Sequence, residues 1–189
     1  VDESHEAFSL FPHRFEFRIR YTLSEQGLRQ DVHVLNFDSA PMPVMLGFHT
    51  AFFAPFSERS APDDVTVKIT IGRRWEIGER MLPTGRLLEL DEAERRLRET
   101  GMAPHARKWG DYYTAEDDGG GNRMEMTDWR ERVKLVYRVG PSFKHWVVWN
   151  DNADGGFICA EPQTCTVNAI NLDIPAEASG LIVLGPGET

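Results

Sequence analysis

The stretch Phe11-Pro-His-Arg-Phe-Glu-Phe-Arg-Ile-Arg-Tyr21 alternates between apolar and charged side chains over its second half. A period of two residues is that of a β-strand with one buried and one solvated face. The turn-forming Ser24-Glu-Gln-Gly27 comes next, and Leu28 to Asn36 then alternates again. Two such runs joined by a short turn predict an antiparallel hairpin.

The same pattern recurs along the rest of the chain. One convincing helix is expected at Asp91–Thr100, with Asp91 as its amino-terminal cap and Gly101 ending it. No alternation of strands and helices appears, so the sequence predicts an all-β antiparallel sandwich with one short helix, as a single domain over residues 1–189. The further expected strands are residues 63–71, 123–129, 132–139, 143–150 and 178–184.

Composition limits the classes of partner. The chain has 189 residues, 41% of them hydrophobic, and a formal net charge of -9. No apolar run approaches the roughly 18 residues of a membrane span, and no basic stripe exists to replace the counterions of nucleic acid. We therefore expect no membrane and no nucleic-acid partner, and a neutral ligand suits this surface better.

Two cysteines, Cys159 and Cys165, are too few for a disulfide framework or a metal-cluster spacing. We expect them to be buried free thiols and the protein to be cytoplasmic. The acidic and glycine-rich segment 116–122 lacks the alternating spacing of a calcium loop and is interpreted as a plain hairpin connection. No metal site is expected.

One carboxylate stands in an unusual place. Glu161 directly precedes Pro162 at the end of a strand-like run, within the stretch Gly156–Leu172. Proline restricts the residue before it to extended geometry, so Glu161 should leave the strand in a fixed direction. It is a candidate catalytic base.

A histidine, His49, lies within the continuous apolar run Val44–Phe56, which predicts a strand covered on both faces. Two interpretations stay open. It is either a core imidazole whose nitrogens are satisfied by backbone groups, or a proton donor lining an aromatic-walled site.

Several motifs, taken in order, resemble the aldose 1-epimerase (galactose mutarotase) family. They cover nearly the whole chain and are the strand Phe15–Tyr21, Asn36 with Met42-Pro43, Gly47-Phe-His-Thr-Ala-Phe-Phe53, Leu82-Pro-Thr-Gly85, Asp111-Tyr-Tyr113, Trp146–Asn150, Glu161-Pro-Gln-Thr and Asn168-Ala-Ile-Asn171. The resemblance implies a β-supersandwich that binds a sugar in a shallow cleft. It also implies that the chain is the carboxy-terminal portion of a longer domain, whose amino-terminal part would be a further partner.

Roles for individual residues follow from this resemblance. Glu161 would take the proton from the anomeric hydroxyl, and His49, with Phe52 three residues later, would protonate the ring oxygen. Asp111 would hold ring hydroxyls, although it stands two residues before its aromatic where the family usually has three. Gln163 and Asn168 are candidate hydroxyl ligands, and they could equally hold the loop together.

The implied reaction interconverts the α and β anomers of an aldose monosaccharide by opening and closing its ring. An acid and a base on opposite sides of the ring suffice, with no metal or cofactor. Aromatic residues could stack on the sugar, although a sandwich core also needs them; they are Phe48, Phe52, Trp109, Tyr112 and Trp149.

Three alternatives remain. The chain could be a sugar-binding module that has lost turnover. It could act on a hexose 6-phosphate, which needs a cationic cluster at the cleft, for which Arg73 and Arg74 are the adjacent basic pair outside the helix. A glycosidase would need two carboxylates, Glu161 with Asp111, but would leave His49 without a role.

Overall fold

The structure is a computed structural model that describes residues 1–154 and 156–189. Contacts divide the chain into two compact units, one formed by Val1–Val44 with Ile182–Thr189 and the other by Met45–Leu181. The single domain predicted over 1–189 therefore stays a prediction. Within the described residues, no helix is both long and apolar enough to cross a membrane.

The smaller unit contains the predicted hairpin. Strand β1 (Phe15–Ser24) pairs with β2 (Gly27–Asn36) in unbroken antiparallel register, with Ser24 opposite Gly27 at the turn. The strands and the turn are as predicted, but the predicted buried face is not, because the apolar side chains of Phe17, Tyr21 and Leu23 are 43%, 61% and 81% exposed.

A second antiparallel pair in this unit joins β3 (Met42–Val44) to β13 (Ile182–Leu184). The buried Asn36 side chain donates hydrogen bonds to the carbonyls of Ala40 and Leu184, each at 2.9 Å. The end of the hairpin is thereby fixed to the last strand.

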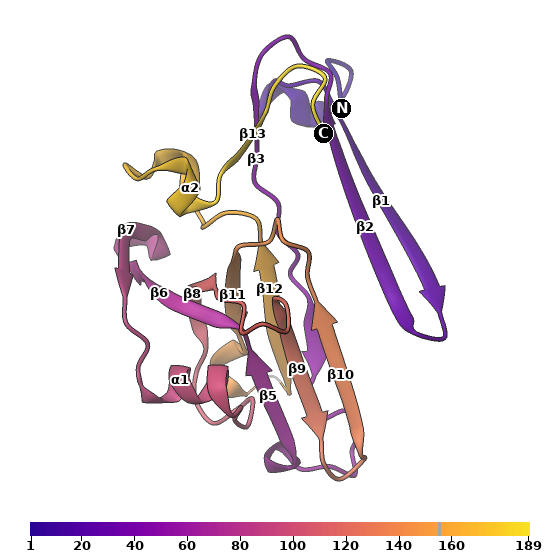
Figure 1. Cartoon of the computed structure of the whole chain (residues 1–189), viewed down its shortest axis with the longest axis vertical. Helices are drawn as coiled ribbons and strands as arrows, with labels where there is room; N and C mark the ends of the chain where they lie inside the picture. The colour runs from indigo at the N-terminus through magenta and orange to yellow at the C-terminus, as the bar shows by residue number, and fades with distance from the viewer. Residues whose placement is uncertain (155) are drawn as a thin grey trace. The chain divides into compact units, whose positions relative to one another are not determined.

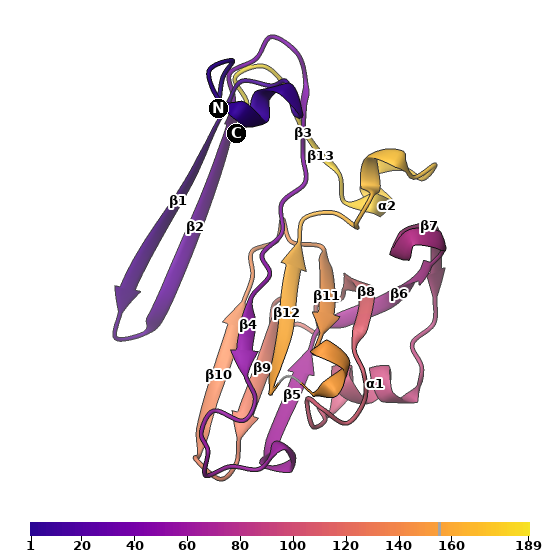
Figure 2. The ribbon, with the colours of Figure 1, turned by 180° about the vertical axis from the view of Figure 1, so that it is seen from behind.

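The larger unit contains two antiparallel sheets among its described residues (Figures 1 and 2). One has the strand order β10-β9-β5 and the other β4-β12-β11-β8-β6-β7. Their bounds are β4 Ala51–Phe53, β5 Val65–Ile69, β6 Ile71–Ile77, β7 Pro83–Leu88, β8 Gly110–Ala115, β9 Arg123–Asp128, β10 Val133–Arg138, β11 His145–Trp149 and β12 Phe157–Gln163.

The inner faces of these two sheets share one hydrophobic core. Val67 of β5 and Met126 of β9 are fully buried in the same cluster as Trp146 of β11 and Ile158 of β12. Packing of this kind is that of a sandwich, in which alternate residues of each strand face the opposite sheet. The predicted all-β antiparallel class is confirmed.

Two strand predictions were wrong in detail. The run 63–71 is not one strand, because β5 ends at Ile69 and β6 begins at Ile71 in the other sheet. The run Val44–Phe56 is not a strand covered on both faces. After Val44, the last residue of β3, it contains only the short β4 at the sheet edge, where Phe52 packs on the core and Phe53 is 78% exposed.

The predicted helix is confirmed as α1 (Glu92–Glu99). Asp91 caps it by accepting a hydrogen bond from the Glu94 N–H, while the Glu94 carboxylate accepts one from the Asp91 N–H. This reciprocal capping box satisfies two backbone donors at the start of the helix. A second, four-residue helix, α2 (Ala176–Ser179), was not predicted, and the strand expected at 178–184 is therefore wrong in part, since only Ile182–Leu184 of it form β13.

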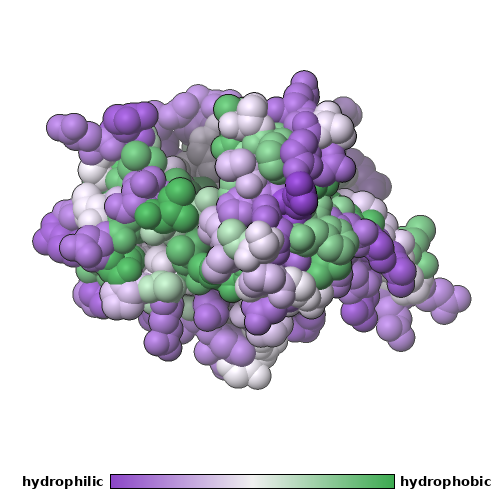
Figure 3. All heavy atoms as spheres, turned by 90° about the horizontal axis from the view of Figure 1, so that it is seen from above, coloured by the Kyte–Doolittle hydropathy of each residue, from purple (hydrophilic) through white to green (hydrophobic). Residues whose placement is uncertain are grey.

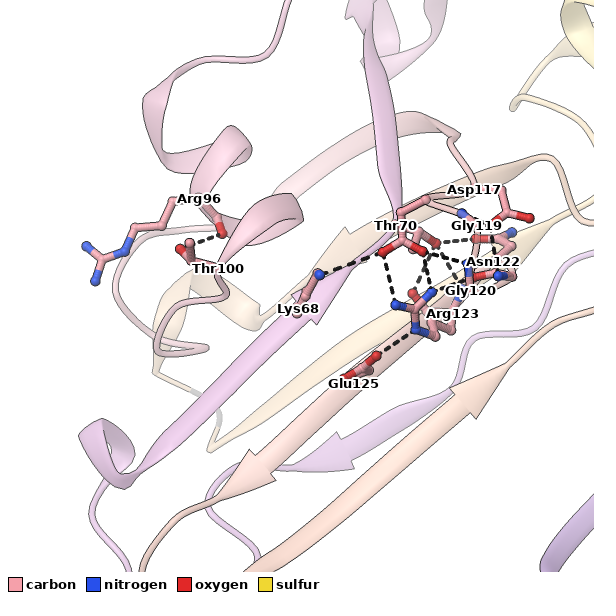
Figure 4. Close-up of polar contacts among 12 residues, drawn as sticks. Lys68, Thr70, Arg96, Thr100, Asp117, Gly119, Gly120, Asn122, Arg123 and Glu125 are labelled. Carbon is pink, nitrogen blue, oxygen red and sulfur yellow. Dashed lines mark hydrogen bonds and ion pairs between the residues drawn. The ribbon is translucent and has the colours of Figure 1, made fainter.

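The segment 116–122 joins β8 to β9, which lie in different sheets, so it is not the hairpin that the sequence suggested. Asp117 accepts hydrogen bonds from the N–H groups of Gly119 and Gly121, each at 2.8 Å (Figure 4). Asp118 accepts from the Arg123 guanidinium at 2.6 Å. The aspartates thus accept hydrogen bonds from the loop's own backbone and from the Arg123 guanidinium.

Figure 3 shows one face of the molecule by hydropathy. Hydrophilic residues cover most of this face, and hydrophobic ones gather in separate patches between them.

Candidate active site

Strand β12 carries the candidate base. Its core-facing residues are Ile158 and Ala160, so alternation directs Cys159, Glu161 and Gln163 to the opposite face of the sheet. The Glu161 side chain is only 8% exposed, although it lies outside the hydrophobic core. A carboxylate held in such a place is positioned by the sheet.

His49 reaches this carboxylate from the segment that runs beside β12. The Phe48 N–H donates to the Pro162 carbonyl and the Ala160 N–H donates to the Thr50 carbonyl, both at 3.1 Å. These two hydrogen bonds place His49 beside Glu161. Its Nε2 atom lies 3.2 Å from Oε1 of Glu161, and its side chain is 63% exposed.

The expectation of an acid and a base facing each other from opposite sides of a sugar ring is therefore wrong. The two segments lie side by side, as adjacent strands of a sheet do at a spacing of about 4.8 Å, so the side chains meet directly. The alternative of a core imidazole is also wrong, since His49 is largely exposed.

Cross-strand register builds a floor around this pair. Val147 of β11 lies opposite Glu161 on one side and opposite Tyr112 of β8 on the other. In the next row, Trp149 lies opposite Cys159. The Trp149 ring also packs edge-on against the His49 imidazole, with 5.7 Å between the ring centres.

Above this floor is an open cleft of about 680 Å³. Strands contribute the floor, and loops that carry Met81, Lys108, Asn152 and Val167 contribute the rim. The lining residues are His49, Met81, Lys108, Trp109, Gly110, Asp111, Tyr112, Val147, Trp149, Asn152, Glu161, Gln163 and Val167.

Burial shapes the electrostatics of the cleft. It raises the pKa of Glu161 above its ordinary value of 4.5, because a charged carboxylate loses hydration there, while the nearby His49 partly opposes the rise. The pKa of Tyr112 is raised by burial and by the charges of Glu161 and Asp111. The Glu161 carboxylate is therefore a stronger base than an exposed glutamate.

Gln163 lies two residues beyond Glu161 and lines the same cleft. Its side-chain amide packs onto Gly47, where an added Cβ would overlap it. The close approach of the Gln163 side chain thus explains why a glycine stands at position 47, in the motif Gly47–Phe53.

Asp111 also lines the cleft, and its carboxylate lies 3.9 Å from the Arg107 guanidinium. It is opposite Val148, a core residue, whereas its neighbour Tyr112 is opposite Val147. Of the two, Tyr112 shares the face of Glu161.

The two other predicted binding residues are not among those that line the cleft. Phe52 packs against the core, with its ring centre 5.6 Å from that of Tyr137. Asn168 has a left-handed backbone conformation, and its side-chain oxygen accepts a 2.6 Å hydrogen bond from Asn171. For Asn168, the structure favours the role of holding the loop together.

Sequence reasoning missed several lining residues. Trp149 and Tyr112 were noticed only as two of many aromatics. Lys108, Asn152 and Val167 come from irregular segments without a periodic signal. A local cue existed for Lys108 only in its position next to Trp109.

Comparison with known proteins adds independent evidence. A family model described as aldose 1-epimerase matches residues 1–189. The structure is similar to that of a galactose mutarotase-like protein from Clostridium acetobutylicum, with a TM-score of 0.93 and 32% sequence identity. That match covers 100% of this chain and 57% of the Clostridium protein.

More distant structures show the same fold. A galactose mutarotase-like protein from Lactobacillus casei matches with a TM-score of 0.74 and 20% identity, over 99% of this chain and 64% of that one. A galactose mutarotase related enzyme from Lactobacillus acidophilus matches with a TM-score of 0.65 and 17% identity, over 100% and 62%. The predicted mutarotase-type supersandwich is confirmed.

Proposed function

Because the chain belongs to the aldose 1-epimerase family, we propose that it interconverts the α and β anomers of a neutral aldohexose. The chain spans 57% of the length of the Clostridium protein. The activity proposed for this chain is therefore argued from the residues that line its cleft.

The observation that carries the proposal is the contact between Nε2 of His49 and Oε1 of Glu161 at the edge of the cleft. The anomeric hydroxyl and the ring oxygen of a pyranose are bonded to the same carbon. A base for the first and an acid for the second can therefore stand next to each other. Two adjacent side chains are compatible with this reaction.

In the proposed reaction, the Glu161 carboxylate removes the proton from the anomeric hydroxyl while His49 protonates the ring oxygen. The ring bond breaks, the freed aldehyde rotates, and both proton transfers reverse on the other face. A positioned acid and a positioned base each contribute about 10²–10⁴-fold. Substrate entry would separate the two side chains, and the exposed His49 is free to move.

The rest of the cleft supports a sugar ligand. Trp149 and Tyr112 offer aromatic faces for the apolar side of a pyranose, while Gln163 and Asp111 offer hydrogen-bonding groups for its hydroxyls. Cytoplasmic location and the use of a monosaccharide substrate remain parts of the proposal.

A neutral sugar is favoured over a sugar phosphate. Among the described residues, Lys108 is the one lysine or arginine that lines the cleft. Arg73 lies 3.1 Å from Glu89 and Arg74 lies 3.0 Å from Glu94, so the basic pair considered for phosphate binding is engaged elsewhere.

The test is polarimetry of freshly dissolved α-D-glucose and α-D-galactose with the wild type and with Glu161→Gln. We expect the variant to lose at least about 10²-fold in rate, because an amide cannot accept the proton. Glu89→Gln is the matched control, since Glu89 is 85% exposed and does not line the cleft.

An unchanged rate in Glu161→Gln would refute the assignment of the base. If the wild type binds either sugar in a calorimetric titration without accelerating anomer exchange, the chain is a sugar-binding module instead.

A further inference from the structure

A third chemically distinctive group lies close to the proposed acid and base. Cys159 shares the face of Glu161 on β12, two residues away, and is fully buried. The ligand atoms of His49, Cys159 and Glu161 all lie within 4.8 Å of one another. The proposed reaction has no use for the thiol.

We propose that His49, Cys159 and Glu161 together bind a divalent ion of the zinc type, and that the bound ion blocks the proposed acid and base. Imidazole, thiolate and carboxylate are the three side-chain ligands that Zn²⁺ takes in proteins. A site that includes sulfur also selects against Mg²⁺ and Ca²⁺, which prefer oxygen ligands alone.

The geometry needs only small adjustments. Metal–ligand bonds of about 2.0–2.3 Å in a tetrahedral arrangement place ligand atoms about 3.3–3.6 Å apart. The pair His49–Glu161 already has 3.2 Å between its atoms. His49 is 63% exposed, so its imidazole can turn toward the sulfur without disturbing the core.

The site is open on one side. Both His49 and Glu161 line the cleft, so an ion held by three protein ligands would have its fourth position available to water or to a sugar oxygen.

On binding, the S–H bond of Cys159 is replaced by a sulfur–metal bond, and the thiol proton passes to water. His49 and Glu161 coordinate through lone pairs, so no group is oxidised or reduced. The same lone pairs would be needed for proton transfer, and the ion would therefore act as a reversible inhibitor of the proposed reaction.

The primary test is titration of the full 189-residue chain with Co²⁺, which reports tetrahedral sites by its visible bands and thiolate ligation by a near-ultraviolet charge-transfer band. We expect both signals in the wild type, and their loss when Zn²⁺ is added in competition.

The chain offers a matched control for the thiol. Cys159→Ser should lack the charge-transfer band and bind Zn²⁺ at least about tenfold more weakly. Cys165→Ser replaces the other buried free cysteine, which is outside the three-residue cluster, and should keep both properties. A band that is absent from the wild type or that persists in Cys159→Ser would overturn the proposal.

His49→Ala tests the same site without changing a buried residue. It should weaken Co²⁺ and Zn²⁺ binding by at least about tenfold, and unchanged affinity would contradict the site. These readouts do not depend on mutarotation.

Where mutarotation is measured, Zn²⁺ should inhibit it, EDTA should restore it, and an excess of Mg²⁺ should have no effect. Zn²⁺ inhibition that is equal in wild type and Cys159→Ser, each relative to its own metal-free rate, would show that the ion acts elsewhere.

Discussion

Two glutamates of the larger unit are almost equally hidden from solvent, yet their surroundings differ sharply. Glu94 of α1 has a side chain with 0% exposure, and Glu161 of β12 has one with 8%. The Glu94 carboxylate accepts hydrogen bonds from the Arg74 guanidinium, the Tyr113 hydroxyl and the Asp91 N–H, at 3.0, 2.9 and 2.7 Å.

Glu161 lacks such a set of partners. Within the described part of the chain, its carboxylate has one ion-pair partner, the exposed His49. A buried carboxylate that is fully hydrogen-bonded and paired stabilises the fold, whereas one that is left short of partners keeps its lone pairs for a ligand. Burial alone therefore does not distinguish a structural acid from a chemical one, but the number of donors around it does.

The sharpest test of this contrast is removal of each carboxylate in turn. Glu94→Ala should lower the free energy of unfolding by about 3–5 kcal/mol, because it leaves Arg74 partly buried without its partner. Glu161→Ala should change it by less than about 1 kcal/mol. Urea denaturation measures both, and comparable losses in the two variants would remove the distinction.

A smaller effect is expected from the Glu94 partner on β8. Tyr113→Phe deletes a buried hydrogen bond to a charged group and should destabilise the protein by about 1.5–3 kcal/mol. Tyr112→Phe is the matched control, because Tyr112 lies in the cleft and is only partly buried. Thermal unfolding of the two variants should separate them, and equal shifts would argue against the Glu94 network.

The smallest effect concerns pH. The pKa of Glu161 is raised by burial above 4.5, so the folded state holds this proton more tightly than the unfolded chain does. Its contribution to stability is present below about pH 4.5 and is lost as the pH rises through the folded pKa. A tenfold difference in proton affinity between the folded and unfolded states corresponds to about 1.4 kcal/mol.

The proposed activity should change in the opposite direction over the same window, because only the ionised carboxylate accepts a proton. Unfolding of the wild type and of Glu161→Gln, compared between about pH 4 and 8, tests this. The variant should gain stability relative to wild type as the pH rises. A stability difference that is independent of pH would show that burial does not shift the pKa of Glu161.

Local patterns were sufficient for much of the fold. Alternation gave β1 and β2, and Asp91 with Gly101 gave the ends of α1, because each of these features depends on neighbours in sequence. The break at Thr70 was not visible. Ile69 and Ile71 continue the alternation while the chain passes from one sheet to the other, and period two does not record which sheet a strand joins.

The site was predictable only in part. Pro162 drew attention to Glu161 and the apolar run Val44–Phe56 to His49, the family resemblance gave each a role, and the structure places the two side by side. The proximity of Cys159 to His49 could not be foreseen, because it depends on the segment before β4 running along β12. Tyr112 was likewise lost among the aromatics, since register, rather than residue type, puts it on the face of Glu161.

Asn150, directly after β11, uses its side chain to hold the loop that borders the cleft, and its oxygen also accepts a 3.2 Å hydrogen bond from the Ala153 N–H in the next turn. Its amide nitrogen donates to the carbonyls of Pro104 and Arg107, at 2.9 and 2.8 Å, and its oxygen accepts from the Trp109 N–H at 2.9 Å. These hydrogen bonds tie the loop at the rim of the cleft to the end of β11, which forms part of its floor. A visiting molecule would meet a backbone already in its final form, so that side chains such as His49 are what must adjust and little of the affinity would be spent on ordering the loops.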